Sequence, residues 1–351
     1  MSDEKRRLPL LTNSSLTTFR RCPREYYYAY VLRRRAVRKS DALRFGTLFH
    51  VGLNAWWTWT GDADVKLASA TLAMSRKAEE YADADPFELV KAEELMLGYT
   101  ARWGDEPYET LAVEKQFRLP LLSPRSSHPQ DSATGFDQGG AIDAIARIGS
   151  FIDELNHEAT VHVVEHKTTS QDISPGAPYW NNIVALDSQV STYMEAAREL
   201  GYAPRDCIYD VIRKPDVNPL KATPEESKKY TKPTKAEPVP RLYSGQREED
   251  ETPEEYRARL RKDITKSPDW YYQRMTVVRL EHDDAGHERD TLETACMIRF
   301  AEERNAWPRS TKSCERYRRL CDYHPVCSGT ASINDLRFET KESTHEELGD
   351  I

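Results

Sequence analysis

The sequence predicts an α/β protein: a mixed central sheet flanked by helices, with a helical N-terminal region and a cysteine-bearing C-terminal segment. In the first third of the chain apolar residues recur at helical spacing, and from residue 111 they alternate with polar residues as in strands. The 351 residues are 38% hydrophobic and 10% aromatic. That composition supplies a sizeable core and excludes a chain that is disordered throughout.

Charge and cysteine content narrow the class of protein further. The net charge is −8, yet residues 1–40 hold eleven basic and three acidic residues. No run approaches the roughly 18 apolar residues that a membrane span needs, and no apolar segment of signal-peptide length follows the N-terminus. We therefore expect a cytoplasmic protein without a membrane partner. Six cysteines are too few for a disulfide scaffold, so clustered ones indicate metal binding or catalysis.

Capping residues and first-turn prolines predict the helices of the N-terminal region. Asn13-Ser14 can cap the first helix, and Pro23 opens the second. In the third helix His50 shares an inward face with Leu53 and Trp57. The expected ranges are 13–21, a helix from 23, one from 41 to before 61, then 62–82 and 86–103.

The middle of the chain predicts the sheet. Alternating runs at 139–149 and 159–167 are joined by a connection containing Asp153, Glu154 and Asn156, which is most simply an antiparallel hairpin. The other expected elements are strands from 111 to 119, at 207–213 and at 275–281, and helices at 187–200, 252–264 and 285–305. Five regions are predicted along the chain. They are a helical N-terminal region (1–105), a core (106–213), an extended insertion (214–251), a C-terminal helical part (252–328) and an acidic tail (329–351), which we expect to fray after 338.

The hairpin carries candidate catalytic residues. Side chains two apart in a strand point the same way, so Glu165 and Lys167 share a face, and strand pairing can bring Asp143 beside them. Two carboxylates suit a hard cation such as Mg²⁺, while the lysine can orient or deprotonate an attacking water. A structural ion pair across the strands is the competing interpretation.

The order of these motifs resembles the RecB-like and AddB-like branch of the PD-(D/E)XK nuclease superfamily, whose core is restriction-endonuclease-like. The residues that carry the resemblance are His50 in GTLFH, Asp143 in GGAIDAI, Glu165-His166-Lys167, and Gln189-x-x-x-Tyr193. The familiar proline before the aspartate is replaced by Ile142.

The resemblance implies roles for these side chains. His50 would join Asp143 and Glu165 in binding Mg²⁺ or Mn²⁺, with the carbonyl of His166 completing the coordination. Gln189 and Tyr193 are four apart on one helix face and would position the scissile phosphate or Lys167. A hydrogen-bonded core histidine and the polar rim of a packed helix are the alternatives. Glu114 is a weaker candidate for a second-metal or structural carboxylate.

Four cysteines form a one-plus-three pattern. Cys314, Cys321 and Cys327 lie close together near the C-terminus, whereas Cys22 is isolated near the N-terminus. Cluster thiolates need only converge in space. Zinc ligands more often come in pairs with two to four residues between them, although His324 lies between Cys321 and Cys327 and makes a zinc site an alternative. Scattered core and surface thiols without a shared ligand are a further alternative. Cys207 and Cys296 lie on apolar-periodic elements and are expected to be buried structural thiols.

This cysteine pattern around a RecB-like core resembles the iron-sulfur exonucleases: the AddB nuclease domain, the CRISPR-associated family, and stand-alone phage or prophage versions. The resemblance implies a 4Fe-4S cluster held by Cys22, Cys314, Cys321 and Cys327, with structural Zn²⁺ as the alternative.

A basic and aromatic segment at 20–39 is the candidate DNA-binding region. Cations neutralise phosphates and aromatic faces stack on bases, which suits a single strand. A solvated basic helix with core tyrosines is the alternative. The candidates are Arg20, Arg21, Arg24, Tyr27, Arg33 and Arg34, and Arg316, Arg318 and Arg319 would add cationic surface beside the cysteines.

The resemblance therefore implies a Mg²⁺- or Mn²⁺-dependent deoxyribonuclease. We expect an exonuclease acting on single-stranded DNA ends in recombination, repair or phage DNA processing, with a possible recombination or helicase partner. The alternatives are a non-catalytic DNA-end-binding or recombination accessory protein with the same fold, and a zinc-stabilised nucleic-acid-binding protein.

Overall fold

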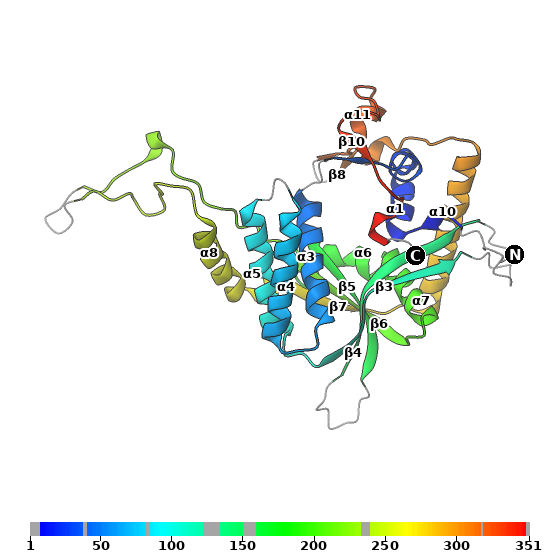
Figure 1. Cartoon of the computed structure of the whole chain (residues 1–351), viewed down its shortest axis with the longest axis horizontal. Coiled ribbons are helices and arrows are strands. Elements are labelled where there is room, and N and C mark those ends of the chain that lie inside the picture. Colours follow the sequence, from blue (N-terminus) through cyan, green and yellow to red (C-terminus); the bar gives the residue numbers. More distant parts are fainter. Residues whose placement is uncertain are drawn as a thin grey trace.

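A computed structural model of the chain describes residues 8–37, 41–81, 85–121, 134–149, 159–232, 239–316 and 319–348. In that part of the chain a six-stranded mixed sheet is flanked by helices, which confirms the predicted α/β class (Figure 1). The strands of the sheet are β1 (Leu10–Leu11), β3 (Tyr108–Pro120), β4 (Asp137–Ile148), β5 (Thr160–Thr169), β6 (Pro204–Arg213) and β7 (Tyr272–Val277).

Strand β4 has a different set of neighbours on each edge. One edge pairs with β3 along its whole length. On the other edge β5 pairs antiparallel from Ile148 to Ala144, and β1 pairs parallel at Asp137 and Gln138. Between these two pairings, residues 139–143 of this edge pair with no strand of the described chain. β6 then runs parallel to β5, and β7 antiparallel to β6.

The pairing of β4 with β5 confirms the predicted hairpin, while the connection with Asp153, Glu154 and Asn156 lies outside the described residues. The strand bounds differ from expectation. β3 begins at Tyr108 rather than 111, β6 at Pro204 rather than 207, and β7 at Tyr272 rather than 275. β7 ends at Val277 rather than 281, because Val278 and Leu280 are more than half exposed and lead into the next helix.

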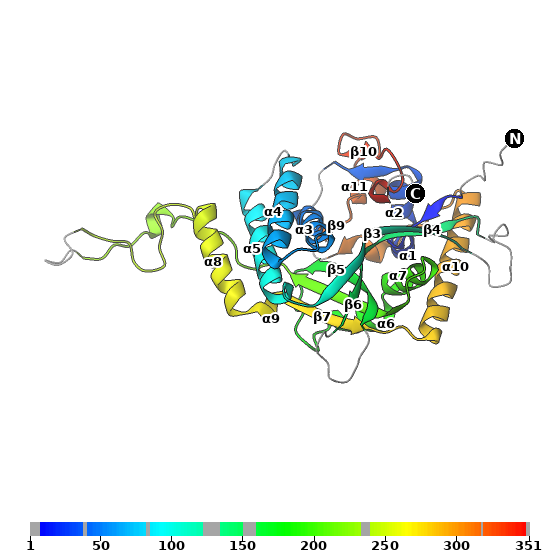
Figure 2. The same cartoon turned by 60° about the horizontal axis from the view of Figure 1, so that its bottom comes forward.

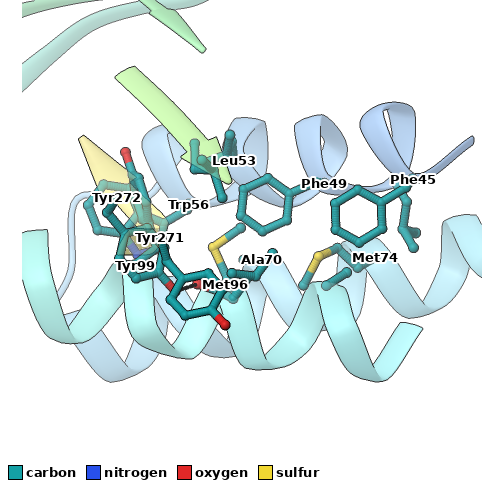
Figure 3. Packing of buried hydrophobic residues seen from close by; sticks show 14 of the residues in the cluster. Phe45, Phe49, Leu53, Trp56, Ala70, Met74, Met96, Tyr99, Tyr271 and Tyr272 are labelled. Atoms are coloured by element: carbon teal, nitrogen blue, oxygen red, sulfur yellow. Dashed lines mark hydrogen bonds between the residues drawn. The ribbon is translucent and has the colours of Figure 1, made fainter. Parts of the chain in front are cut away.

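Three N-terminal helices cover one face of the sheet: α3 (Asp41–Thr58), α4 (Ala63–Glu79) and α5 (Pro86–Trp103) (Figures 1 and 2). Phe49, Leu53 and Trp56 of α3 interlock with Met74 of α4 and Met96 of α5 (Figure 3). All five side chains are fully buried. This packing directs one side of α3, including the turn that bears His50, toward the centre of the sheet.

The opposite face is covered by α6 (Tyr179–Leu186) and α7 (Ser188–Glu199). Val190 and Met194 of α7 pack against Ile145, Val163 and Val211 of the sheet. The predicted helix at 187–200 is therefore confirmed as α7. Helix α6 was not expected, since its N-cap residue Pro178 gives no side-chain capping signal.

The ends of the described chain pack together around the remaining helices. β10 (Phe338–Thr340) pairs antiparallel with β2 (Arg34–Ala36), and Leu348 is 3% exposed. The expectation that the tail frays after 338 is thus wrong for residues 338–348, because strand pairing and burial hold them. The elements of these ends are α1 (Asn13–Arg21), α2 (Pro23–Tyr26), the π-helix η1 (Tyr27–Val31), α10 (Glu281–Glu303), η3 (Thr311–Ser313), β8 (Glu315–Arg316), β9 (Arg319–Leu320), α11 (His324–Cys327) and η4 (Glu346–Leu348).

The described part of residues 214–251 extends away from the sheet (Figures 1 and 2). In its described part the regular structure is η2 (Glu225–Ser227) and one bridge between Tyr230 and Leu242. Helix α8 (Pro253–Lys266) follows with the expected capping box, and α9 (Pro268–Tyr271) leads into β7. No helix of the described chain is long and apolar enough to cross a membrane.

Candidate active site

The candidate catalytic residues meet where β4 and β5 separate. Their ladder ends at Ala144 and Val164, one residue before Asp143 and Glu165. Beyond that point the backbone N–H of His166 donates to Oδ2 of Asp143 at 2.8 Å. A side chain thus replaces the next ladder contact, and the two carboxylates lie at an opening in the sheet rather than inside a continuous ladder.

Lys167 links this opening to helix α7. Its Nζ donates to Oε1 of Glu165 and, at 2.9 Å, to Oε1 of Gln189. Gln189 in turn donates to the hydroxyl of Tyr193 at 2.9 Å. The structure therefore brings the expected lysine, glutamine and tyrosine into one hydrogen-bonded chain that begins at the candidate catalytic carboxylate of Glu165.

Burial and neighbouring charges perturb the titration of this group. Glu165 is fully buried, and burial together with the nearby Asp143 raises its pKa to about 8. Burial opposes the charge of Lys167, but the adjacent Glu165 and Asp143 carboxylates raise its pKa above the usual value. Lys167 is therefore an ammonium at neutral pH, which suits orientation of water and charge stabilisation better than deprotonation.

The structure places His50 beside the same opening. Burial lowers its pKa to about 4, against the opposing influence of Asp143. It is therefore neutral at physiological pH, the form in which imidazole coordinates metals. Its ring lies 6.5 Å from that of His166, centroid to centroid. The His166 ring packs against Trp57 of α3. It therefore lies on the opposite face of β5 from Glu165 and Lys167, as the alternation of side chains along a strand predicts.

Glu114 is also part of this neighbourhood. It lies between the residues that pair with Ala144 and Ile142, which puts it opposite Asp143, and it has a left-handed φ of 46°. Asn54 donates to its Oε1 at 2.7 Å, and burial together with Asp143 raises its pKa. The carboxylate of Glu114 thus lies near Asp143, and its role as a second-metal or structural carboxylate stays a prediction.

Comparison with known proteins agrees with this geometry. The family model of the PD-(D/E)XK nuclease superfamily matches residues 11–328. The chain belongs to the PD-(D/E)XK nuclease superfamily. A comparison with curated proteins found no match to the chain. Members of this superfamily are nucleases, which hydrolyse nucleic acids and typically use divalent metal ions.

The donor set of this PD-(D/E)XK protein fits a divalent cation. Among the described residues no three His, Cys, Asp or Glu side chains already lie close enough to hold an ion. One oxygen that could coordinate a metal ion is nevertheless present: Oε2 of Glu165 is buried without a hydrogen-bond partner in the described chain. Carboxylate oxygens are the ligands that Mg²⁺ and Mn²⁺ prefer, and the ammonium of Lys167 occupies the other oxygen of Glu165.

A buried ionic network supports the catalytic strand from behind. Asp210 of β6 lies beside His166, with its Oδ2 3.2 Å from Nδ1 of the imidazole. The same carboxylate accepts from the hydroxyl of Tyr99 at 2.7 Å and pairs with Arg274 at 3.2 Å. Burial alone would raise the pKa of Asp210, but Arg274 and His166 hold it well below the usual value. The strand that carries the motif is thus anchored by charges in the interior.

The four predicted cluster cysteines line one cavity. Cys22 borders it from the N-terminal side, and Cys314, Cys321 and Cys327 border it from the C-terminal side. The backbone N–H of Cys321 donates to the carbonyl of Cys314 at 2.8 Å. Cys207 is buried as expected, but Cys296 is exposed, because it lies beside rather than on the buried stripe of α10.

The candidate DNA-binding arginines contact the protein itself. Arg20 donates to Thr294 at 2.8 Å, and Arg24 to the carbonyl of Trp307 at 2.7 Å. The Tyr27 ring stacks on Trp307, while Tyr26 and Tyr28 are buried. Arg21 pairs with Glu25, Arg33 donates to the carbonyl of Glu342, Arg34 donates to Asn334, and Arg318 lies outside the described residues. DNA binding by this segment stays a prediction.

Three residues of the site were missed by sequence reasoning. Asp187 caps α7 by accepting from the N–H of Gln189, so it fixes the helix that holds Lys167. Asn54 lies four residues after His50, one helical turn along the same face. Asp210 interrupts the apolar strand CIYDVIR. A charged residue in a buried strand is the signal that was available for it.

Proposed function

We propose that the chain is a Mg²⁺- or Mn²⁺-dependent deoxyribonuclease. The observation that carries this proposal is the hydrogen-bonded chain from Glu165 through Lys167 to Gln189, beside Asp143, in a member of a nuclease superfamily. Action as an exonuclease on single-stranded ends rests on the resemblance of the motif order to the RecB-like branch.

Each side chain has a part in the proposed reaction. Asp143, Glu165, His50 and the carbonyl of His166 would hold the ion, which when bound stabilises charge on the phosphate undergoing displacement. The Lys167 ammonium would orient the attacking water and stabilise negative charge on the phosphate oxygens. Gln189 and Tyr193 position that ammonium. The nucleophile is water, and the products are a phosphate monoester and a hydroxyl.

A 4Fe-4S cluster held by Cys22, Cys314, Cys321 and Cys327 is the second part of the proposal. The four thiols border one cavity, so residues from both ends of the chain are brought together there. The cluster is proposed because the one-plus-three pattern resembles that of the iron-sulfur exonucleases, and structural Zn²⁺ is the alternative.

The activity can be tested with protein purified without oxygen. Wild type and Lys167→Ala are incubated with end-labelled linear and with circular single-stranded DNA, with and without Mn²⁺. We expect metal-dependent loss of linear DNA only, and at least about a 10²-fold lower rate for Lys167→Ala. Lys262→Ala, an exposed lysine of α8, is the matched control and should cleave like wild type.

Two results would contradict the proposal. Full cleavage by Lys167→Ala would reject the role of that residue. No cleavage by folded wild-type protein would favour the non-catalytic DNA-end-binding or recombination accessory protein. A role in recombination, repair or phage DNA processing, with a recombination or helicase partner, is proposed by resemblance alone.

A further inference from the structure

A cleft leads from Lys167 to the cysteine-bearing segment. Part of its lining is the end of β5 and the turn after it, from Lys167 to Gln171. Another part is Arg316, Arg319 and Leu320 of the β8–β9 hairpin, together with Cys321. The cleft is therefore shared by the proposed catalytic lysine and a part of the chain some 150 residues further on.

Positive charge gathers in this cleft although the chain as a whole is acidic. Lys167, Lys214, Arg316 and Arg319 line it. The acidic residues of its lining are Glu25, which pairs with Arg21, and Asp322, while the cation Lys167 pairs with Glu165. In a protein of net charge −8, this local excess of cations favours a polyanionic ligand.

The rest of the lining fits nucleotides rather than phosphate alone. Thr168, Thr169 and Ser170 also line the cleft, and hydroxyl groups can donate to phosphate oxygens. Leu43 and Leu320 are 65% and 59% exposed, and Tyr179 lies with them in the lining. A duplex hides the faces of its bases, whereas a single strand offers them to apolar and aromatic side chains.

We propose that this cleft binds the single DNA strand whose scissile phosphate reaches Lys167. Lys214, Arg316 and Arg319 contact its phosphates, while Leu43, Tyr179 and Leu320 contact its bases. The inference rests on the proposed nuclease function. It assigns strand binding to the cleft and to the β8–β9 hairpin, because their cations line one cleft together with Lys167.

Binding is measured without metal, so that cleavage does not interfere. Fluorescence anisotropy of a labelled oligothymidylate gives Kd and its dependence on salt for wild type, Arg319→Ala and Lys214→Ala. We expect Kd to rise about 3- to 10-fold in each variant and the salt slope to fall by about one. Arg289→Ala, an exposed arginine of α10 outside the cleft, should match wild type.

A separate variant tests the preference of the cleft for single-stranded over duplex DNA. Leu320→Ser should weaken binding of the oligothymidylate and leave binding of a blunt duplex of equal length unchanged. Equal weakening for both ligands would reject the contact with bases. Unchanged Kd and salt slope in both Arg319→Ala and Lys214→Ala, with melting temperatures like wild type, would overturn the cleft as the binding site. Because binding is read without cleavage, these results are distinct from failure of the Lys167→Ala test.

Discussion

The catalytic cluster and the cysteine-lined cavity are built in opposite ways. The cluster lies on two paired strands, and its parts are fixed by a ladder, by α7 and by the Asp210 network. The cavity brings together Cys22 and Cys314, which are 292 positions apart, and is lined in part by elements of three or four residues such as η3 and α11. Such short elements have no independent stability. We infer that the first site is preorganised by the fold, whereas the second would gain its order from the proposed 4Fe-4S cluster.

The largest effect is expected at the cavity. Cys321→Ser should lose the iron and the visible absorbance of the protein. It should lower the melting temperature by about 10 °C or more, because structural metal sites contribute many kcal/mol to folding. Iron analysis and thermal unfolding measure both. Cys296→Ser, which removes an exposed thiol, is the control, and a wild-type iron content in Cys321→Ser would exclude that ligand.

The next effect concerns the support behind the catalytic strand. Asp210→Asn leaves the buried Arg274 without its full counter-charge, so we expect about 3–5 kcal/mol lower free energy of unfolding in urea. Asp216→Asn breaks a pair whose carboxylate is 63% exposed and should cost less than about 1 kcal/mol. If the two variants were equally stable, the catalytic strand would not depend on its interior charges.

A third prediction uses the raised pKa of Glu165. Between the unfolded pKa of about 4.5 and the folded value of about 8, the folded metal-free protein holds a proton that the unfolded chain releases. The free energy of unfolding should therefore decrease as pH rises through this window, with a slope that corresponds to the loss of at most one bound proton on unfolding. Glu165→Gln should remove that part of the slope, as urea unfolding at several pH values would show. An unchanged slope would mean that Glu165 is ionised in the fold.

The smallest effect is expected where the C-terminal tail approaches the catalytic cluster. Leu348 borders a pocket that Gln189 and Tyr193 also line, and its carbonyl accepts from Gln116 at 2.8 Å. Leu348→Ala should cost about 2 kcal/mol. Leu336→Ala, at a side chain that is 96% exposed, should change stability by less than about 0.5 kcal/mol. Equal stability of the two variants would show that the tail contributes nothing to the fold.

Much of the catalytic strand pair was predictable, because alternation of side chains is a local property. The period of two placed Glu165 and Lys167 on one face, and the hairpin pattern put Asp143 near them. Helix caps were equally local, as at Thr252 and Glu255. The tail was mistaken for a frayed end because its burial depends on β2, some 300 residues earlier.

The role of the arginines at 20–35 was also beyond local reasoning. The sequence of this segment is the same whether its arginines face solvent or contact carbonyls and carboxylates of the chain itself. Arg24 reaches the carbonyl of Trp307, and Arg35 pairs with Glu339 and Glu346. Only partners from the other end of the chain distinguish a DNA-binding surface from an internal contact.

The sequence by itself determined the strand and helix periods, the types of the candidate catalytic residues and the one-plus-three cysteine pattern. These are consequences of spacing along the chain, which the backbone converts directly into faces. The tertiary structure decided where β4 and β5 part, which carboxylate oxygen is left without a partner, and which cations line the cleft from Lys167 to Arg319. Those features arise from the desolvation and convergence of distant segments, which no local pattern encodes.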